Sequence, residues 1–318
     1  MSTRRWRKRL KNDAIYVLVR LLVGTVRGLP LPLARRATRA LGACAYLLAP
    51  KLRRLTLQNL RFAFGDRLTE RQVRALAWRV FRELAGNAAD AFRLDLVPPE
   101  ELVRSDSFDV LRRALARGRG LLVATGHVGN WEVLGAYLAS RGVPLTALAA
   151  RIYDPRLDCL VAKLRRKAGV RTIRHNRSGL SMARILKAGG ALGVLIDLRQ
   201  ERIGQTVRFF GRPAHAVDGP FHLAVRLRVP VVFAAAWREA DGLYRAEFQL
   251  VEPPAGLTAP EKATWLLQVC TNRLEEVIRR VPSQWIWMHP RWEPVPRAKV
   301  RVFRKSAPER PAGVVEQV

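Results

Sequence analysis

The sequence contains few cysteines, and this scarcity excludes several classes of protein. Its 318 residues include three, Cys44, Cys159 and Cys270, and no two of them form a CxxC pair. We therefore expect neither a disulfide framework nor a cysteine zinc site, and a reducing compartment fits the pattern. No repeat, low-complexity tract or flexible linker is present, and 49% of residues are hydrophobic, which is enough for a sizeable core.

Acidic residues are also scarce relative to basic ones. The chain has 57 Lys and Arg against 26 Asp and Glu, a formal net charge of +31. Such a charge favours polyanionic partners, namely nucleic acid, an anionic membrane face or a phosphorylated substrate. Nucleic-acid binding is the remote alternative, because the basic residues are spread along the chain and no helix-turn-helix, zinc finger or RNA-binding motif is found. No nucleic acid is therefore expected as a partner.

The sequence has no long uninterrupted apolar run, even near its N-terminus. A basic cluster over residues 4–11 precedes an apolar segment, residues 14–26, that Arg20 interrupts. The segment is shorter than the ~20 apolar residues of a spanning helix, and no convincing signal cleavage site follows it. We expect a helix that lies in the membrane interface, within a membrane-associating helical segment over residues 1–50. The alternative is an ordinary amphipathic helix packed on the domain.

The remainder of the chain predicts an α/β fold with a mostly parallel central sheet flanked by helices. Residues 51–100 form a helical lead-in, in which Thr69 and Gln72 fit a capping box. Residues 101–295 form the main domain, because short apolar runs alternate there with helical stretches. Residues 296–318 form a C-terminal tail. The predicted strands are 120–125, 145–150, 191–196 and 231–237, and the predicted helices are 131–141, 155–168, 179–189, 219–228 and 260–280.

One strand-to-helix junction, the segment GHVGNWE at residues 126–132, contains candidate catalytic groups. His127 directly follows a buried strand, Asn130 is placed to cap the next helix, and Glu132 lies in that helix's first turn. A carboxylate on one imidazole nitrogen leaves the other nitrogen free to take a proton from a hydroxyl. The spacing is not that of a HExxH zinc helix. The alternative is a core histidine, with Glu132 interacting with the helix dipole.

This segment resembles the HxxxxD/E block of glycerolipid-type acyltransferases. More particularly, the chain resembles the lipid A biosynthesis (lauroyl or myristoyl) acyltransferases of the lysophospholipid acyltransferase superfamily over roughly residues 50–295. Four further blocks carry the resemblance: LTLQNL with FGD at 55–60 and 64–66, RIYDP at 151–155, FFGR at 209–212, and QWIWMHPRW at 284–292. The sequence departs from the family where Leu198, rather than Gln, follows Asp197.

The resemblance implies an O-acyltransferase that needs no cofactor or metal. The acyl donor would be a thioester, on acyl carrier protein, and the acceptor a hydroxyl of a phosphorylated glycolipid. A lipid A precursor is the expected acceptor, which implies lipopolysaccharide biosynthesis, and a phosphatidylinositol mannoside is the alternative. The expected location is the inner (cytoplasmic) membrane, with anionic lipid as a partner and residues 101–295 as the catalytic domain on the cytoplasmic face. The absence of a PEGT block argues against a simple glycerol-phosphate acceptor.

The resemblance also implies roles for single residues. His127 would be the general base, oriented by Glu132. Arg151 would bind a phosphate of donor or acceptor. Asp197 would position Arg151 or an acceptor hydroxyl. Two further residues are expected at the substrate: Asn130, beside the histidine, and Phe210, lining the acyl groove. The alternative for Phe210 is a place in the core, which is the commoner role of an aromatic pair.

Overall fold

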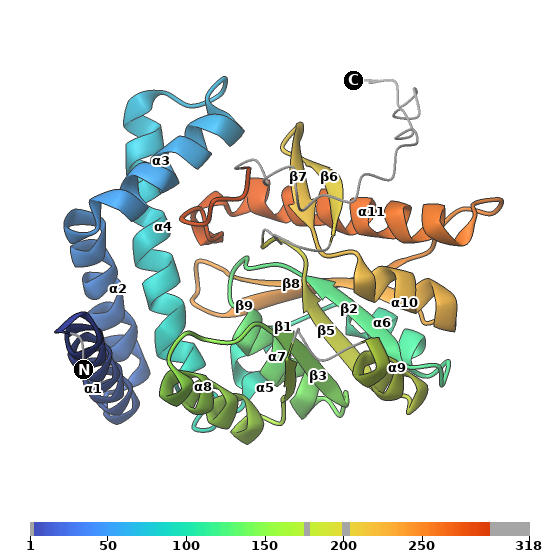
Figure 1. The fold of residues 1–318 in the computed structure, drawn as a ribbon, viewed down its shortest axis with the longest axis horizontal. Coiled ribbons are helices and arrows are strands. Elements are labelled where there is room, and N and C mark those ends of the chain that lie inside the picture. Colours follow the sequence, from blue (N-terminus) through green and yellow to red (C-terminus); the bar gives the residue numbers. More distant parts are fainter. Residues whose placement is uncertain (1–2, 175–178, 199–203, 293–318) are drawn as a thin grey trace.

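The fold is built around a seven-stranded sheet, seen in a computed structural model that describes residues 3–174, 179–198 and 204–292 (Figure 1). The predicted tail at 296–318 lies outside the described residues. The strand order is β1-β9-β8-β2-β5-β3-β4, and every neighbouring pair is parallel except β8 and β9. The expected mostly parallel sheet is therefore confirmed. The strands are β1 Val103–Arg104, β2 Leu121–Thr125, β3 Leu145–Ala149, β4 Arg171–Arg174, β5 Ala191–Leu195, β8 Val231–Arg238 and β9 Tyr244–Val251.

Helices cover both faces of this sheet, as expected for a buried parallel sheet. On one face lie α9 (Gly179–Lys187), α10 (Gly219–Leu227) and α11 (Ala259–Arg280), with the hairpin of β6 (Gln205–Phe209) and β7 (Arg212–Ala216) packed on α11 (Figure 1). The other face is covered by the remaining helices of the α/β region. These are α5 (Pro99–Leu102), α6 (Phe108–Leu115), α7 (Trp131–Ser140) and α8 (Pro155–Lys167).

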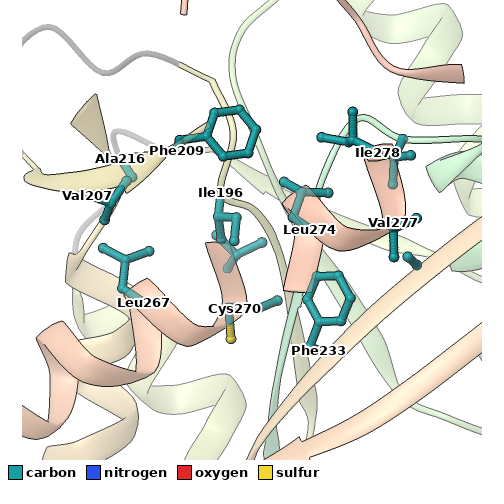
Figure 2. Packing of buried hydrophobic residues seen from close by; sticks show 14 of the residues in the cluster. Ile196, Val207, Phe209, Ala216, Phe233, Leu267, Cys270, Leu274, Val277 and Ile278 are labelled. Atoms are coloured by element: carbon teal, nitrogen blue, oxygen red, sulfur yellow. The ribbon is translucent and has the colours of Figure 1, made fainter. Parts of the chain in front are cut away.

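The apolar face of α11 forms much of the core on the first side. Figure 2 shows its side chains, among them Cys270 and Leu274, packed between the hairpin and the strands. Cys270 is fully buried and burial raises the pKa of its thiol, so it behaves here as a small apolar group. The helix begins with a capping box formed by Thr258 and Glu261.

Four N-terminal helices stand together at one end of the molecule (left in Figure 1). They are α1 (Thr3–Gly28), α2 (Leu31–Leu48), α3 (Pro50–Phe64) and α4 (Glu70–Ala91). The predicted capping box at Thr69 and Gln72 is present at the start of α4.

The first helix packs on the domain along part of its length. Its C-terminal part packs on the domain through buried Val23 and Val26, and Arg27 forms an ion pair of 2.5 Å with Asp95. Its preceding part leaves apolar side chains such as Leu18 exposed. Among residues 3–174, 179–198 and 204–292, no helix combines the length and the apolar composition that crossing a bilayer requires.

The carboxyl ends of β2, β3, β5 and β8 share one edge of the sheet, because these strands are mutually parallel. His127 follows β2, Asp197 follows the neighbouring β5, and Arg151 follows β3 on the far side of β5. In open α/β sheets this edge is where ligands bind. The topology thus brings together three residues that are well separated in sequence.

Candidate active site

The loop that carries His127 is held by backbone contacts on two sides. Val128 forms an antiparallel bridge with Trp285, and the Gly129 N–H donates to the Gln284 carbonyl at 2.8 Å. The Asn130 N–H donates to the carbonyl of Ala236 on β8 at 3.0 Å. The loop is therefore fixed between β8 and the C-terminal signature segment.

A glycine is needed at position 129 of this loop. Its φ of +55° lies in the left-handed region, and a Cβ there would come within 1.8 Å of the Ala236 carbonyl oxygen. The Gly129 carbonyl in turn accepts a hydrogen bond of 2.5 Å from the amide of buried Asn87 on α4. Close backbone packing thus sets the position of the histidine two residues earlier.

His127 makes its side-chain hydrogen bond to Asp197. The Nδ1 atom lies 2.7 Å from Asp197 Oδ1, and the His127 backbone N–H donates to Oδ2 at 2.6 Å. The His127 side chain is 12% exposed, so its ring lies at the edge of the buried region. With Nδ1 occupied, Nε2 is the nitrogen left to accept a proton, which is the arrangement of a general base backed by a carboxylate.

Asp197 is suited to this backing role because it is buried and remains ionised. Burial alone would raise its pKa, but attraction to His127 and hydrogen bonds from His127 and the Trp285 indole outweigh burial and lower the pKa to about 2. The expectation that Asp197 positions Arg151 is not met in the described residues. Within the described residues, Asp197 accepts hydrogen bonds from His127 and Trp285 alone. Its side chain is also buried, since the residue is 1% exposed.

Glu132 makes a different contact from the one expected of it. Its carboxylate receives two hydrogen bonds from Arg165 of α8, at 2.5 and 2.8 Å, and a third from the Trp131 indole at 3.1 Å. In the described part of the chain no hydrogen bond or ion pair joins Glu132 to His127, whose Nδ1 is bonded to Asp197, so the expectation that Glu132 orients the imidazole is wrong for this structure. Burial lowers the pKa of Arg165, but the bonds to Glu132 outweigh it and raise the pKa above its usual value.

Trp131 lies between the pair of His127 and Asp197 and the pair of Glu132 and Arg165. Its ring contacts the His127 ring edge-on, with centroids 4.6 Å apart, and its indole N–H donates to Glu132. The ion pair of Glu132 and Arg165 is therefore linked to the histidine through the Trp131 side chain.

An apolar pocket opens beside Trp131 and the ion pair, between α7, α8 and the sheet. Its empty volume is about 620 Å³, including space open to solvent. Its lining includes Trp131, Glu132 and Arg165, and because the Trp131 ring contacts His127, the pocket lies next to the histidine. The rest of its lining is apolar: Leu94, Val123, Leu134, Gly135, Leu138, Leu145, Ala147, Leu148, Ala149, Ala168, Val170, Gly193 and Leu195, with Thr125 as the one polar addition.

Two residues that were expected to contact the substrate instead contact other residues of the protein core. Asn130 caps α7 as predicted, accepting from the Val133 N–H at 3.3 Å. Both hydrogens of its amide are used, because it donates to the Asn87 carbonyl and to the Tyr244 hydroxyl, each at 3.1 Å. Asn130 is also 2% exposed, so the structure gives it the role of a cap within the core.

Phe210 likewise lies in the core and not in the pocket. It sits at the turn between β6 and β7 and is 7% exposed. Its ring packs on Phe64 and Trp287, with centroids 5.5 and 5.7 Å away, and beneath the guanidinium of Arg279 at 4.6 Å. Phe210 therefore does not line the apolar pocket, contrary to the expectation that it would line the acyl groove.

Arg151 is exposed at the end of β3, on the same edge of the sheet as His127. Within the described residues it forms no ion pair or hydrogen bond, so its guanidinium is available to a ligand. Sequence reasoning did not single out Arg165 or Asn87, because helical spacing alone does not indicate which polar residue of a helix faces a site.

Comparison with known proteins identifies the class of enzyme. A sequence profile of the bacterial lipid A biosynthesis acyltransferase family matches residues 1–293, so the chain belongs to that family and is an acyltransferase. Similar curated proteins include phosphatidylinositol mannoside acyltransferases of Mycobacterium tuberculosis (strain H37Rv), 27% identical over 212 residues, and Mycolicibacterium smegmatis, 25% identical over 210 residues. The matches cover 64% of this chain and 66% and 67% of those relatives, so the chain spans about two thirds of the first relative's length.

Proposed function

We propose that the enzyme transfers a fatty acyl chain from a thioester to a hydroxyl of a phosphorylated glycolipid, with His127 as general base. The observation that carries this proposal is the hydrogen bond of 2.7 Å between His127 Nδ1 and buried Asp197. His127 Nε2 takes the proton of the acceptor hydroxyl as its oxygen attacks the thioester carbonyl. The tetrahedral intermediate then expels the thiolate, which receives that proton from the imidazolium. The carboxylate of Asp197 stabilises the imidazolium between the two steps.

The apolar pocket is proposed to hold the acyl chain. It adjoins Trp131, whose ring contacts His127, and its lining is almost wholly apolar. An alkyl chain is stabilised in such a pocket by burial, at about 0.8 kcal/mol for each buried methylene. The ion pair of Glu132 and Arg165 would stand where the pocket meets the polar thioester.

Arg151 is proposed to bind a phosphate of the donor or of the acceptor. It is exposed, it makes no ion pair among the described residues, and it lies at the sheet edge that carries His127. Its planar guanidinium donates two parallel hydrogen bonds to phosphate oxygens. Acyl carrier protein, which is acidic, is the proposed donor, since the net charge of +31 favours its approach.

The N-terminal helices are proposed to bind the anionic face of the inner membrane from the cytoplasm. Of the fourteen large apolar side chains exposed in the described part of the chain, eleven lie before residue 53. Only one acidic residue, Asp13, occurs before Asp66, so this surface is also strongly basic. Apolar burial and attraction to anionic lipid together give stable interfacial binding. The eleven are Trp6, Leu10, Ile15, Val17, Leu18, Leu21, Leu33, Leu41, Leu47, Leu48 and Leu52.

The acceptor is proposed to be a lipid A precursor, as the family description suggests. A phosphatidylinositol mannoside is the second candidate, and the curated relatives favour it. Both are phosphorylated, sugar-bearing lipids, so both would present a hydroxyl to His127 and a phosphate to an arginine such as Arg151.

The test is an acyl-transfer assay on the purified full chain in detergent or vesicles. Acyl carrier protein and coenzyme A thioesters of several chain lengths are offered with each of the two acceptors, and products are read by mass spectrometry. An acceptor that gains one acyl ester, with release of the free thiol, supports the proposal and identifies the acceptor. Release of thiol with no acylated glycolipid from either acceptor would overturn it.

A further inference from the structure

Trp285, in the C-terminal signature, is hydrogen-bonded directly to the carboxylate of Asp197. It is fully buried, and its indole N–H donates to Asp197 Oδ2 at 2.8 Å. Its backbone forms the bridge to Val128, one residue after the histidine. The His127 loop and the Trp285 segment are thus paired through their backbones, and each donates one hydrogen bond to the same oxygen of Asp197.

The two oxygens of Asp197 have different partners. Oδ1 faces the imidazole Nδ1 at 2.7 Å, whereas Oδ2 accepts from the His127 backbone N–H and from the Trp285 indole. A carboxylate that accepts on only one oxygen is free to rotate about its Cβ–Cγ bond. The bonds to Oδ2 fix that rotation and so aim Oδ1 at the imidazole. Charge-assisted hydrogen bonds of this kind are the stronger ones in proteins.

We propose that Trp285 is a positioning residue of the transfer reaction, which orients the Asp197 carboxylate toward His127 through its indole N–H. The inference rests on the proposed function, since it needs His127 to act as the base. It assigns a role in the reaction to one residue of the C-terminal signature, Trp285, which is 88 positions from Asp197 in the chain. Gly126 also lies close to the carboxylate, since a Cβ at this position would come within 3.0 Å of Oδ2.

The chain offers a matched control two residues away. Trp287 is also fully buried, and its indole N–H also makes one hydrogen bond, of 2.7 Å, but to the carbonyl of Pro282. The two indole rings pack edge-on against each other, with centroids 4.7 Å apart. Replacing either tryptophan by Phe removes one indole hydrogen bond and a similar apolar area, while only Trp285→Phe takes a donor from Asp197.

The experiment compares Trp285→Phe and Trp287→Phe in the full-length enzyme, each alone and combined with Asp197→Asn. We expect Trp285→Phe to lower kcat about tenfold with little change in KM, and Trp287→Phe to leave kcat within about twofold. In the Asp197→Asn background the effect of Trp285→Phe should shrink to less than about twofold, because the group on which it acts has lost its charge. Melting temperatures of all variants establish that the rates are compared on folded protein.

Either of two results would overturn the inference: equal losses of kcat in the two Phe variants, or an undiminished effect of Trp285→Phe in the Asp197→Asn background. If Trp285→Phe fails to fold, benzothienylalanine is incorporated at position 285, since its sulfur replaces the N–H within a ring of nearly the same shape. The same tenfold loss is then expected, and wild-type kcat would contradict the inference. An active His127→Ala variant would instead refute the proposed function, so the two failures are distinguishable.

Discussion

The imidazole of His127 and the carboxylate of Asp197 are joined by a hydrogen bond of 2.7 Å across 70 residues of sequence. They meet because β2 and β5 are adjacent parallel strands, and each residue follows the end of its own strand. The nearer carboxylate in sequence, Glu132, is held by Arg165 instead. The carboxylate that pairs with His127 is thus set by sheet topology and not by spacing within the GHVGNWE segment.

The first prediction concerns Asp197. Asp197→Asn keeps the size of the side chain but removes the charge that stabilises an imidazolium. We expect kcat to fall on the order of a hundredfold or more, with KM changed much less. Steady-state kinetics of the folded variant, with circular dichroism as the control, provide the measurement. A kcat within about threefold of wild type would mean that the carboxylate is only structural.

The second prediction concerns the ion pair beside the pocket. Glu132→Gln and Arg165→Gln should each lower activity about tenfold, because each leaves a partly buried charge without its partner. The double variant should be no worse than either single variant, since the two residues act as one unit. Fully additive losses in this cycle would indicate that Glu132 acts on the reaction independently of Arg165.

The third prediction concerns acyl-chain length. At Gly135 of α7, a Cβ would meet Val170 and Leu145 at 3.6 and 3.7 Å, which is ordinary van der Waals contact, so Gly135→Ala is sterically tolerated and fills the pocket. We expect it to shift the preferred donor to a shorter chain, and Leu138→Ala, which enlarges the pocket, to shift it to a longer one. Competition among donors of mixed length, read by mass spectrometry, gives the preference. An unchanged preference in both variants would place the acyl chain elsewhere.

The fourth prediction concerns membrane binding. Leu18 and Leu21 are 67% and 64% exposed on α1. The double substitution Leu18→Glu with Leu21→Glu therefore leaves the packing of buried Val26 intact, whereas deletion of residues 1–28 would remove it. We expect weaker flotation with anionic vesicles and lower activity on vesicle-embedded acceptor, with activity on detergent-dispersed acceptor retained.

The control for this experiment introduces the same charges away from the proposed surface. Leu96→Glu with Leu180→Glu adds two carboxylates at exposed positions outside α1, one in the turn after α4 and one on α9. It should float like the wild type. Equal loss of flotation in both double variants would mean that net charge, rather than the apolar face of α1, determines membrane binding.

The strands and helices that position the site could largely be predicted from the sequence. Four apolar runs mark β2, β3, β5 and β8 to within about a residue, because buried parallel strands are continuously apolar. Shorter or more polar strands were not predicted, because they lack a continuous apolar run. β4, with the sequence RTIR, has exposed ends, and β9 alternates between buried and half-buried residues along YRAEFQLV.

The candidate site was only partly predictable. The position of His127 and the cap at Asn130 follow from local turn and helix signals. The partner of His127 does not, since nothing local tells whether a carboxylate five residues away or one on the next strand will reach the imidazole. Asp197 had one available signal, its position directly after a neighbouring buried strand. For Arg165, which pairs with Glu132, the sequence offers no signal beyond its place on a basic helix.

The most direct test of the central claim is the rate of acyl transfer by His127→Ala. The His127 side chain is 12% exposed and its loop is held by backbone contacts, so the variant should fold and melt close to the wild type. We expect kcat for acylation of the glycolipid to fall by ~10²–10⁴. A folded His127→Ala enzyme that keeps more than a tenth of wild-type kcat would contradict the account.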